Sequence, residues 1–204
     1  MTCLFGGTFD PVHYGHLTPL AELQQRIDCH EVHVIPAAIP PHRLPPVAST
    51  DQRLAMLRIA LEDYPGWKLD TCELERSGPS YSVLTLQSMR ASRPDDSLCL
   101  VMGSDAFAGF PTWYHWQEIF ELCHIVVIER PDEPAAVEHE WAQKRFVGDA
   151  DTLRTASAGY VYAVSMPLLD ISATDIRDRL AAGQDVQGML PEGVLEYIQE
   201  HGIY

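Results

Sequence analysis

Residues 2–16 read TCLFGGTFDPVHYGH and set a pattern that the rest of the chain repeats: a strand, a turn and a helix. The apolar start predicts a buried strand, and Gly6 and Gly7 predict a tight turn at its end. Glycine at such a turn also lets a ligand approach the backbone closely. His13 and His16 follow at the start of an amphipathic stretch, and their spacing of three residues puts both imidazoles on one helix face.

A phosphate is the ligand that this arrangement suits best. The first N–H groups of a helix are free and carry a partial positive charge, which attracts an anion. Two imidazoles beside them can donate hydrogen bonds to a phosphate whose negative charge grows in a transition state. Two other interpretations stay open. His13 and His16 could be ordinary surface residues, or they could bind zinc, although no third ligand stands at a suitable spacing.

Short apolar runs alternate with amphipathic stretches along the rest of the chain. Strands that are apolar on both faces and alternate with helices are typical of a parallel sheet covered on both sides. We therefore expect an α/β fold of the doubly wound, Rossmann-like type, with a mainly parallel sheet and helices on both faces. Thr50 or Asp51 is the expected N-cap of the second helix. The expected strands lie in 2–7, 31–37, 67–74, 96–107, 123–131 and 159–166, and the expected helices in 17–27, 51–64, 81–90, 117–122, 132–146, 174–182 and 194–202.

Composition limits the partners that this chain can have. Its 204 residues, 46% hydrophobic and 21% charged, are typical of a globular protein, and we expect a single domain over 1–204. A formal net charge of −15 argues against binding nucleic acid, whose phosphates need surplus lysine and arginine. No apolar stretch approaches the length of a membrane span, and no signal peptide is evident. The five scattered cysteines form no Cys-x-x-Cys pair, which favours reduced thiols and a cytoplasmic location.

A second segment, ISATDIRDRL over 171–180, follows the last expected strand. Ser172 or Thr174 would cap its helix, and an ordinary capped amphipathic helix explains most of the pattern. Arg177 is the exception, because a cation in the first turn of a helix opposes the helix dipole unless an anion lies nearby. Two hydroxyls and an arginine at a helix N-terminus suit a phosphate.

Other polar or aromatic residues follow strands in the middle of the chain, where open parallel sheets bind ligands. Asp105 stands just beyond the strand that ends near Gly103, and could accept hydrogen bonds from ribose hydroxyls or simply cap a helix. Arg43, in a proline-rich loop, could bind two phosphate oxygens or lie on a rigid surface turn. Trp113 offers a stacking surface for a flat ring, although aromatic clusters more often form core.

The two segments together resemble a known family. GGTFDPVHYGHL, residues 6–17, resembles the H-x-G-H signature of a nucleotidyltransferase superfamily, and most closely that of the bacterial nicotinate-nucleotide adenylyltransferases. Residues 171–177 resemble its second motif, I-S-x-T-x-x-R, with Ala173 where many members have serine. The resemblance covers nearly the whole chain and is weakest over 132–159. The catalytic residues that it implies are His13, His16 and Arg177.

The resemblance also implies two sets of binding residues. One would hold ATP, with its phosphates against the histidines and the second motif, and the other would hold a mononucleotide, with its pyridine ring stacked on the tryptophan. Ser82 stands where the family often has threonine. The implied ATP-binding residues are Gly6, Gly7, Thr8, Phe9, His13, His16, Arg43, Gly103, Asp105, Ser172, Thr174 and Arg177. The implied mononucleotide-binding residues are Phe9, Tyr81, Ser82, Thr85, Trp113, Tyr114 and Arg130.

The implied reaction joins ATP and nicotinate mononucleotide into deamido-NAD (nicotinate adenine dinucleotide), and releases pyrophosphate, as a step of NAD biosynthesis. Mg²⁺ would arrive with ATP, and we assign no metal ligand. A homo-oligomer is compatible with the resemblance. Three alternatives stay open: phosphopantetheine or cytidylyl transfer, nicotinamide mononucleotide as the acceptor, and a non-catalytic module that binds ATP. A dehydrogenase is not expected, because the chain lacks the G-x-G-x-x-G fingerprint.

Overall fold

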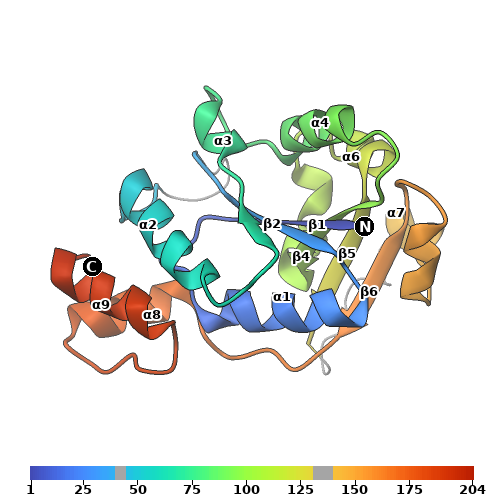
Figure 1. Cartoon of the computed structure of the whole chain (residues 1–204). Helices are drawn as coiled ribbons and strands as arrows, with labels where there is room; N and C mark the ends of the chain where they lie inside the picture. Colours follow the sequence, from blue (N-terminus) through green and yellow to red (C-terminus); the bar gives the residue numbers. More distant parts are fainter. Residues whose placement is uncertain (40–44, 131–139) are drawn as a thin grey trace.

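Six parallel strands form one sheet at the centre of the computed structural model, which describes residues 1–39, 45–130 and 140–204 (Figure 1). The strand order is β3-β2-β1-β4-β5-β6. Every pair of neighbours is parallel, as the alternation of strands and helices predicted. The strands are β1 (Thr2–Gly7), β2 (Glu31–Pro36), β3 (Trp67–Leu69), β4 (Leu98–Gly103), β5 (His124–Glu129) and β6 (Val161–Ser165).

The strand order reverses between β1 and β4. From β1 the chain winds outward through β2 to β3, and it then crosses back to place β4 on the other side of β1. From β4 it winds outward again through β5 to β6. Loops leave such a reversal in opposite directions, so a crevice opens at the carboxyl ends of the two strands. The doubly wound, Rossmann-like fold is confirmed, and its crevice lies after Gly7 and Gly103.

Helices cover both faces of the sheet. In Figure 1, α1 lies below the sheet, and α4 and α6 lie above it. Helices α2, α8 and α9 contribute to the same core as α1, whereas α5 and α7 contribute to the core of α4 and α6. The helices are α1 (Tyr14–Arg26), α2 (Thr50–Leu61), α3 (Cys72–Glu75), α4 (Ser82–Ser92), α5 (Ser104–Ala108), α6 (Trp116–Leu122), α7 (Glu140–Gln143), α8 (Ala173–Ala181) and α9 (Glu192–His201), with 3-10 helices η1 (Phe110–Thr112) and η3 (Ala150–Arg154).

Alternate residues of each strand supply the two cores. Along β4, Cys99 and Val101 face the α1 side, whereas Leu100 and Met102 face the α4 side. Because both faces are covered, both sets of positions are apolar, and the strands read as continuous apolar runs. Within 1–39, 45–130 and 140–204, no helix is both long and apolar enough to cross a membrane.

The strand expected over 67–74 is wrong in its second half. Strand β3 ends at Leu69, and the chain then turns into α3. The side chain of Asp70 causes the change, because its Oδ1 accepts a hydrogen bond from the backbone N–H of Cys72 at 3.1 Å. Aspartate bonds of this kind offer the backbone an alternative to the strand ladder.

Two other expectations about helices need correction or completion. The N-cap of α2 is Ser49, one residue before the expected Thr50. Ser49 Oγ accepts from the N–H of Gln52 at 3.2 Å, and Gln52 Oε1 accepts from the N–H of Ser49 at 2.8 Å, which forms a capping box. The helix expected over 132–146 lies partly outside the described residues, and Glu140–Gln143 (α7) is its described part.

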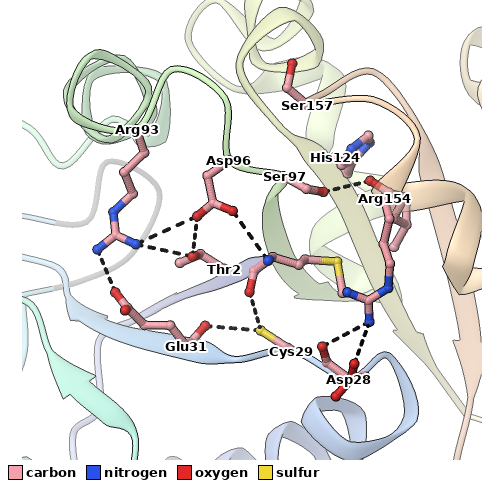
Figure 2. Close-up of polar contacts among 12 residues, drawn as sticks. Thr2, Asp28, Cys29, Glu31, Arg93, Asp96, Ser97, His124, Arg154 and Ser157 are labelled. Atoms are coloured by element: carbon pink, nitrogen blue, oxygen red, sulfur yellow. Dashed lines mark hydrogen bonds and ion pairs between the residues drawn. The ribbon is translucent and has the colours of Figure 1, made fainter.

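A polar network closes the amino end of the sheet, opposite the crevice. Figure 2 shows Arg93 and Asp96, which precede β4, reaching the first two strands. Arg93 Nη2 donates to Glu31 Oε1 at 2.6 Å, and Thr2 Oγ1 donates to Asp96 Oδ2 at 2.6 Å. The crossover that returns the chain from β3 to β4 is therefore fastened to both β1 and β2.

His33 lies next to this network, between two carboxylates. Its Nδ1 is 2.8 Å from Asp70 Oδ2, and its Nε2 is 2.5 Å from Glu31 Oε1. Burial alone would lower the pKa of His33, but the hydrogen bonds to the two carboxylates outweigh burial and raise this pKa above its usual value. The hydrogen bond with His33 in turn lowers the pKa of Asp70 to about 2.

The raised pKa of His33 predicts a pH-dependent contribution to stability. Protonation of His33 favours the folded state, so its contribution is complete below the unfolded pKa of about 6.5 and is lost as pH rises through the folded pKa. The free energy of unfolding of the wild type should therefore exceed that of His33→Gln most at pH 5.5, and the difference should shrink by pH 8.5. Urea unfolding of both proteins at each pH measures it. A difference that does not change with pH would show that His33 keeps one protonation state.

Candidate active site

The turn after β1 folds around a buried phenylalanine. Phe9 has a left-handed backbone (φ +50°) and is 2% exposed. Its ring lies against the rings of Phe5 and His16, with centroids at 5.9 Å and 5.1 Å. A Cβ atom at Gly7 would lie 2.8 Å from this ring, so only glycine lets the turn close over it. Any contact of Phe9 with a nucleotide must come from its main chain.

The two histidines stand together at the start of α1. His13 is the N-cap residue, and its ring stacks on that of His16 with a centroid distance of 3.7 Å. The His13 side chain is buried, and its Nδ1 has no hydrogen-bond partner within the described residues. Burial lowers the pKa of His13 to about 4. The imidazole of His13 is therefore neutral at pH 7 and can donate one hydrogen bond to an anion.

A close backbone contact joins the histidines to the second motif. A Cβ atom at Gly15 would lie only 2.7 Å from the carbonyl oxygen of Ile171 and 2.9 Å from His13 Nδ1. Only glycine allows this approach, which brings the start of α8 beside the start of α1 (Figure 1). Ser172 is the N-cap of α8, and its Oγ accepts from the N–H of Asp175 at 3.1 Å. Segments far apart in the sequence thus form one surface of hydrogen-bond donors.

Arg177 completes this surface. Its Nη1 donates to the carbonyl oxygen of Asp10 at 2.7 Å, and its Nη2 lies 3.2 Å from Thr174 Oγ1. A quarter of the side chain remains exposed. Since a guanidinium has five N–H donors, Arg177 keeps donors for a ligand. The structure brings together His13, His16, Thr174 and Arg177, as the two motifs predicted.

Asp10 is a central residue that the sequence analysis missed. Its buried carboxylate accepts hydrogen bonds from the N–H of Val47 at 2.7 Å, the N–H of Ala48 at 3.0 Å and the hydroxyl of Tyr204 at 2.6 Å. Beside it, the 1%-exposed Arg53 donates to the carbonyl oxygen of Thr8 at 2.7 Å. The one signal in the sequence is a charged residue between the two apolar parts of the turn.

A cavity of about 390 Å³ opens at the reversal of strand order. Its walls come from the ends of β1 and β4, the start of α4, and the segment from α5 to Tyr114. A Cβ atom at Gly103 would lie 2.8 Å from Asp105 Oδ1, so glycine lets this carboxylate fold back over the strand end. The predicted site residues that line the cavity are Gly6, Gly7, Thr8, Tyr81, Ser82, Gly103, Asp105, Trp113 and Tyr114.

Aromatic rings form one side of this cavity. Tyr81 and Tyr114 stack with a centroid distance of 4.5 Å, although Tyr114 is 48% exposed. Trp113 packs on the buried Phe110 at 5.3 Å and contributes to the cavity wall. Flat rings that are supported from behind and face a cavity are suited to stacking on a flat ligand.

The predicted mononucleotide-binding residues Thr85 and Arg130 do not line the cavity. Thr85 is buried, and its hydroxyl donates a hydrogen bond at 2.8 Å to Oε1 of Glu73. Glu73, which the sequence analysis did not single out, lines the cavity itself. Arg130 is exposed at the end of β5 and does not line the cavity. Arg43 lies outside the described residues.

Comparisons with known proteins identify the family. Residues 4–179 match the cytidylyltransferase-like family model. The chain is 44% identical over 205 residues to a protein of Acidithiobacillus ferrooxidans, over 98% of this chain and 94% of that one. It is 43% identical over 208 residues to a protein of Methylococcus capsulatus, over 100% and 99% of the two chains. Both relatives are named "Probable nicotinate-nucleotide adenylyltransferase".

The chain belongs to the nicotinate-nucleotide adenylyltransferase family. It is therefore an enzyme of the nucleotidyltransferase class. Two solved structures of Plasmodium falciparum nicotinic acid mononucleotide adenylyltransferase, complexed with NaAD and with APC, match it with TM-scores of 0.75 and 0.73. They cover 100% of this chain and 96% of their own, at 19% and 18% identity. At that identity the likeness concerns the fold, and it agrees with the doubly wound sheet of this chain.

Gly15→Ala should inactivate the enzyme, because the new methyl group would push the backbone of Ile171 away from the histidines. A displacement of about 1 Å between groups that act on one substrate can lower a rate about a hundredfold. We expect a loss of kcat of about that size or more in a pyrophosphate-release assay. Gly148→Ala is the matched control, because a Cβ atom there meets no atom within 4 Å. Near-normal turnover of Gly15→Ala would contradict the close approach.

Proposed function

We propose that this chain transfers the adenylyl group of ATP to nicotinate mononucleotide, giving deamido-NAD and pyrophosphate in NAD biosynthesis. One observation supports the proposal above the others. The stacked histidines and the second motif meet at Gly15, beside the turn that also lines an aromatic cavity. A phosphate surface next to a ring pocket is what two nucleotide substrates require. The names of the full-length relatives agree with this reaction.

The attacking group is the phosphate of the mononucleotide, which is already an anion near pH 7 because its second pKa is about 6. One of its oxygens forms a bond to the α-phosphorus of ATP. The bond from that phosphorus to the bridging oxygen breaks, and its electron pair leaves with pyrophosphate. No general base is needed for an ionised nucleophile. Catalysis then depends on holding two anions in line and on stabilising the charge that develops on the leaving group.

The phosphate surface supplies the donors for that charge. His13 and His16 donate hydrogen bonds to the ATP phosphates, and Arg177 binds oxygens of the leaving pyrophosphate. Thr174 and Ser172 add hydroxyls at the N-terminus of α8, where the helix dipole favours an anion. Because burial lowers its pKa to about 4, His13 is a neutral donor at pH 7 before ATP binds. We assign Arg43 to the same phosphates from the sequence motif alone.

The two nucleosides bind against different walls of the cavity. Asp105 accepts hydrogen bonds from the ribose of the adenosine, and Gly6, Gly7, Thr8, Phe9 and Gly103 border the same nucleotide with their backbones. The pyridine ring of the mononucleotide stacks on Trp113, as its place in the cavity wall supports. The other mononucleotide-binding residues that we propose are Tyr81, Ser82, Thr85, Tyr114 and Arg130.

We assign Mg²⁺ to the substrate, as the complex with ATP. Among the residues that the structure describes, no group of three or more histidine, cysteine, aspartate or glutamate side chains could hold a metal ion. Phosphate oxygens and water are the ligands that Mg²⁺ usually keeps in such enzymes. A cytoplasmic location also fits, because ATP is the substrate and all five cysteines are free thiols.

Pyrophosphate release with Mg-ATP tests the proposal. Nicotinate mononucleotide, nicotinamide mononucleotide and phosphopantetheine are offered separately to the purified protein, and the dinucleotide product is identified by mass. We expect strong release with nicotinate mononucleotide. Preference for phosphopantetheine would keep the chemistry but overturn the assignment of the aromatic cavity. ATP binding without release in any mixture would favour a non-catalytic module.

His16→Ala should lower kcat about a hundredfold, which is the scale for the loss of one donor to a transition-state charge. The KM values for both substrates should change much less, because the missing bond strengthens only as charge develops. Steady-state rates of pyrophosphate release measure both quantities. His30→Ala, at an exposed histidine outside the crevice, is the control. Turnover of His16→Ala close to that of the wild type would exclude the proposed donor.

A further inference from the structure

The chain beyond α9 turns back toward the active site. Gly202 ends the helix in the left-handed conformation (φ +59°), and the N–H of Ile203 then donates to the carbonyl oxygen of Ile198 at 3.0 Å. Glycine at this position and a bond of this span are typical of a Schellman motif. Ile203 is 6% exposed and packs in the core with α1 and α2. These contacts fix the direction of Tyr204, whose hydroxyl reaches the turn after β1.

Tyr204 completes the hydrogen bonding of a buried carboxylate. Its hydroxyl donates to Asp10 Oδ1 at 2.6 Å, and the N–H of Ala48 donates to the same oxygen at 3.0 Å. The other oxygen accepts from the N–H of Val47 at 2.7 Å. Burial and this contact raise the pKa of Tyr204 above its ordinary value, so the hydroxyl keeps its proton and remains a donor. Asp10 is 6% exposed and therefore depends on these three donors rather than on water.

Among the residues that the structure describes, Arg177 is the cation whose ion-pair distance to this carboxylate is shortest. Its Nη1 is 3.9 Å from Asp10 Oδ2, but it donates to the main-chain oxygen of Asp10 at 2.7 Å. A short move would convert this arrangement into a close ion pair. Charge-assisted bonds between arginine and carboxylate are among the strongest in proteins, so a carboxylate that lost a donor would attract the guanidinium. Such a pair would neutralise the charge that the phosphates need.

We propose that Tyr204 is a positioning residue for catalysis: its hydroxyl occupies Asp10 and thereby keeps Arg177 available for the phosphates of ATP. The inference rests on the proposed function, in which Arg177 binds the leaving pyrophosphate. Arg53 does not take the place of the tyrosine, because within the described residues it makes no hydrogen bond or ion pair with Asp10, and its Nη1 donates to the carbonyl oxygen of Thr8 at 2.7 Å. Tyr204 itself touches no substrate and acts through Asp10.

The test removes one oxygen atom. Tyr204→Phe keeps the ring and its packing, so the melting temperature should change little. We expect kcat to fall about tenfold, the effect of weakening one charge-assisted bond in the transition state, with the KM for the mononucleotide unchanged. Tyr197→Phe is the matched control. It makes the same change in α9, where the ring stacks on His201 and the hydroxyl makes no hydrogen bond with the described residues.

A double-mutant cycle shows whether the effect passes through the arginine. In an Arg177→Gln background, Tyr204→Phe should lower kcat less than twofold, because the cation that it protects is already gone. Full additivity, wild-type kcat in Tyr204→Phe, or an equal loss in Tyr197→Phe would each overturn the inference while leaving the proposed function intact. An inactive wild type with every acceptor would instead overturn the proposed function, and this inference with it.

Discussion

The contact between Gly15 and the carbonyl oxygen of Ile171 is the constraint on which the phosphate surface depends. A separation that admits no Cβ atom holds the start of α1 against the segment that leads into α8. The stacked histidines and Arg177 therefore meet although more than 150 residues separate them in the sequence. The doubly wound sheet makes this possible, because the turn after β1 and the segment after β6 both leave the carboxyl edge of the sheet. The fold brings both segments to the carboxyl edge of the sheet, and the absence of a side chain at Gly15 sets the distance between them.

Electrostatics explain how an acidic protein can bind a polyphosphate with few cationic side chains. With a formal net charge of −15, the surface as a whole repels a polyphosphate, so binding has to come from short-range donors in the crevice. Charges beyond about 10 Å are largely screened at 0.1 M salt, whereas partly buried groups keep most of their interaction. Neutral His13, the N-terminus of α8 and partly exposed Arg177 are donors of that kind. A carboxylate within this cluster is tolerated because Asp10 is surrounded by hydrogen-bond donors.

The sequence predicted the features that depend on local pattern, namely strands and motifs. It did not predict the buried polar residues whose partners lie far away in the sequence. The apolar runs of β1 and β5 predicted strands with nearly correct ends, and the two motifs predicted the histidines and Arg177. The alternation in 67–74 was misleading, because one aspartate bond to Cys72 outweighs a period-two pattern. Asp10 has only a weak local signal, since its burial depends on partners such as Tyr204 that lie far along the chain. Glu73 is buried beside Thr85, which lies in another helix. Whether a polar residue is buried can be judged only once its hydrogen-bond partners are known.

The crevice divides into two parts that differ in construction, and in the proposed reaction this difference separates chemistry from specificity. The phosphate part is held by main-chain approaches and buried hydrogen bonds, so a change at Gly15 or Asp10 would disturb several segments together. The ring part is held by stacked side chains, of which Tyr114 is half exposed, so single substitutions there can reshape the cavity without moving the sheet. One phosphate site can thus serve different acceptors when only the ring part changes. This division accounts for a chain that matches a family model described as cytidylyltransferase-like, yet has full-length relatives named for a nicotinate nucleotide.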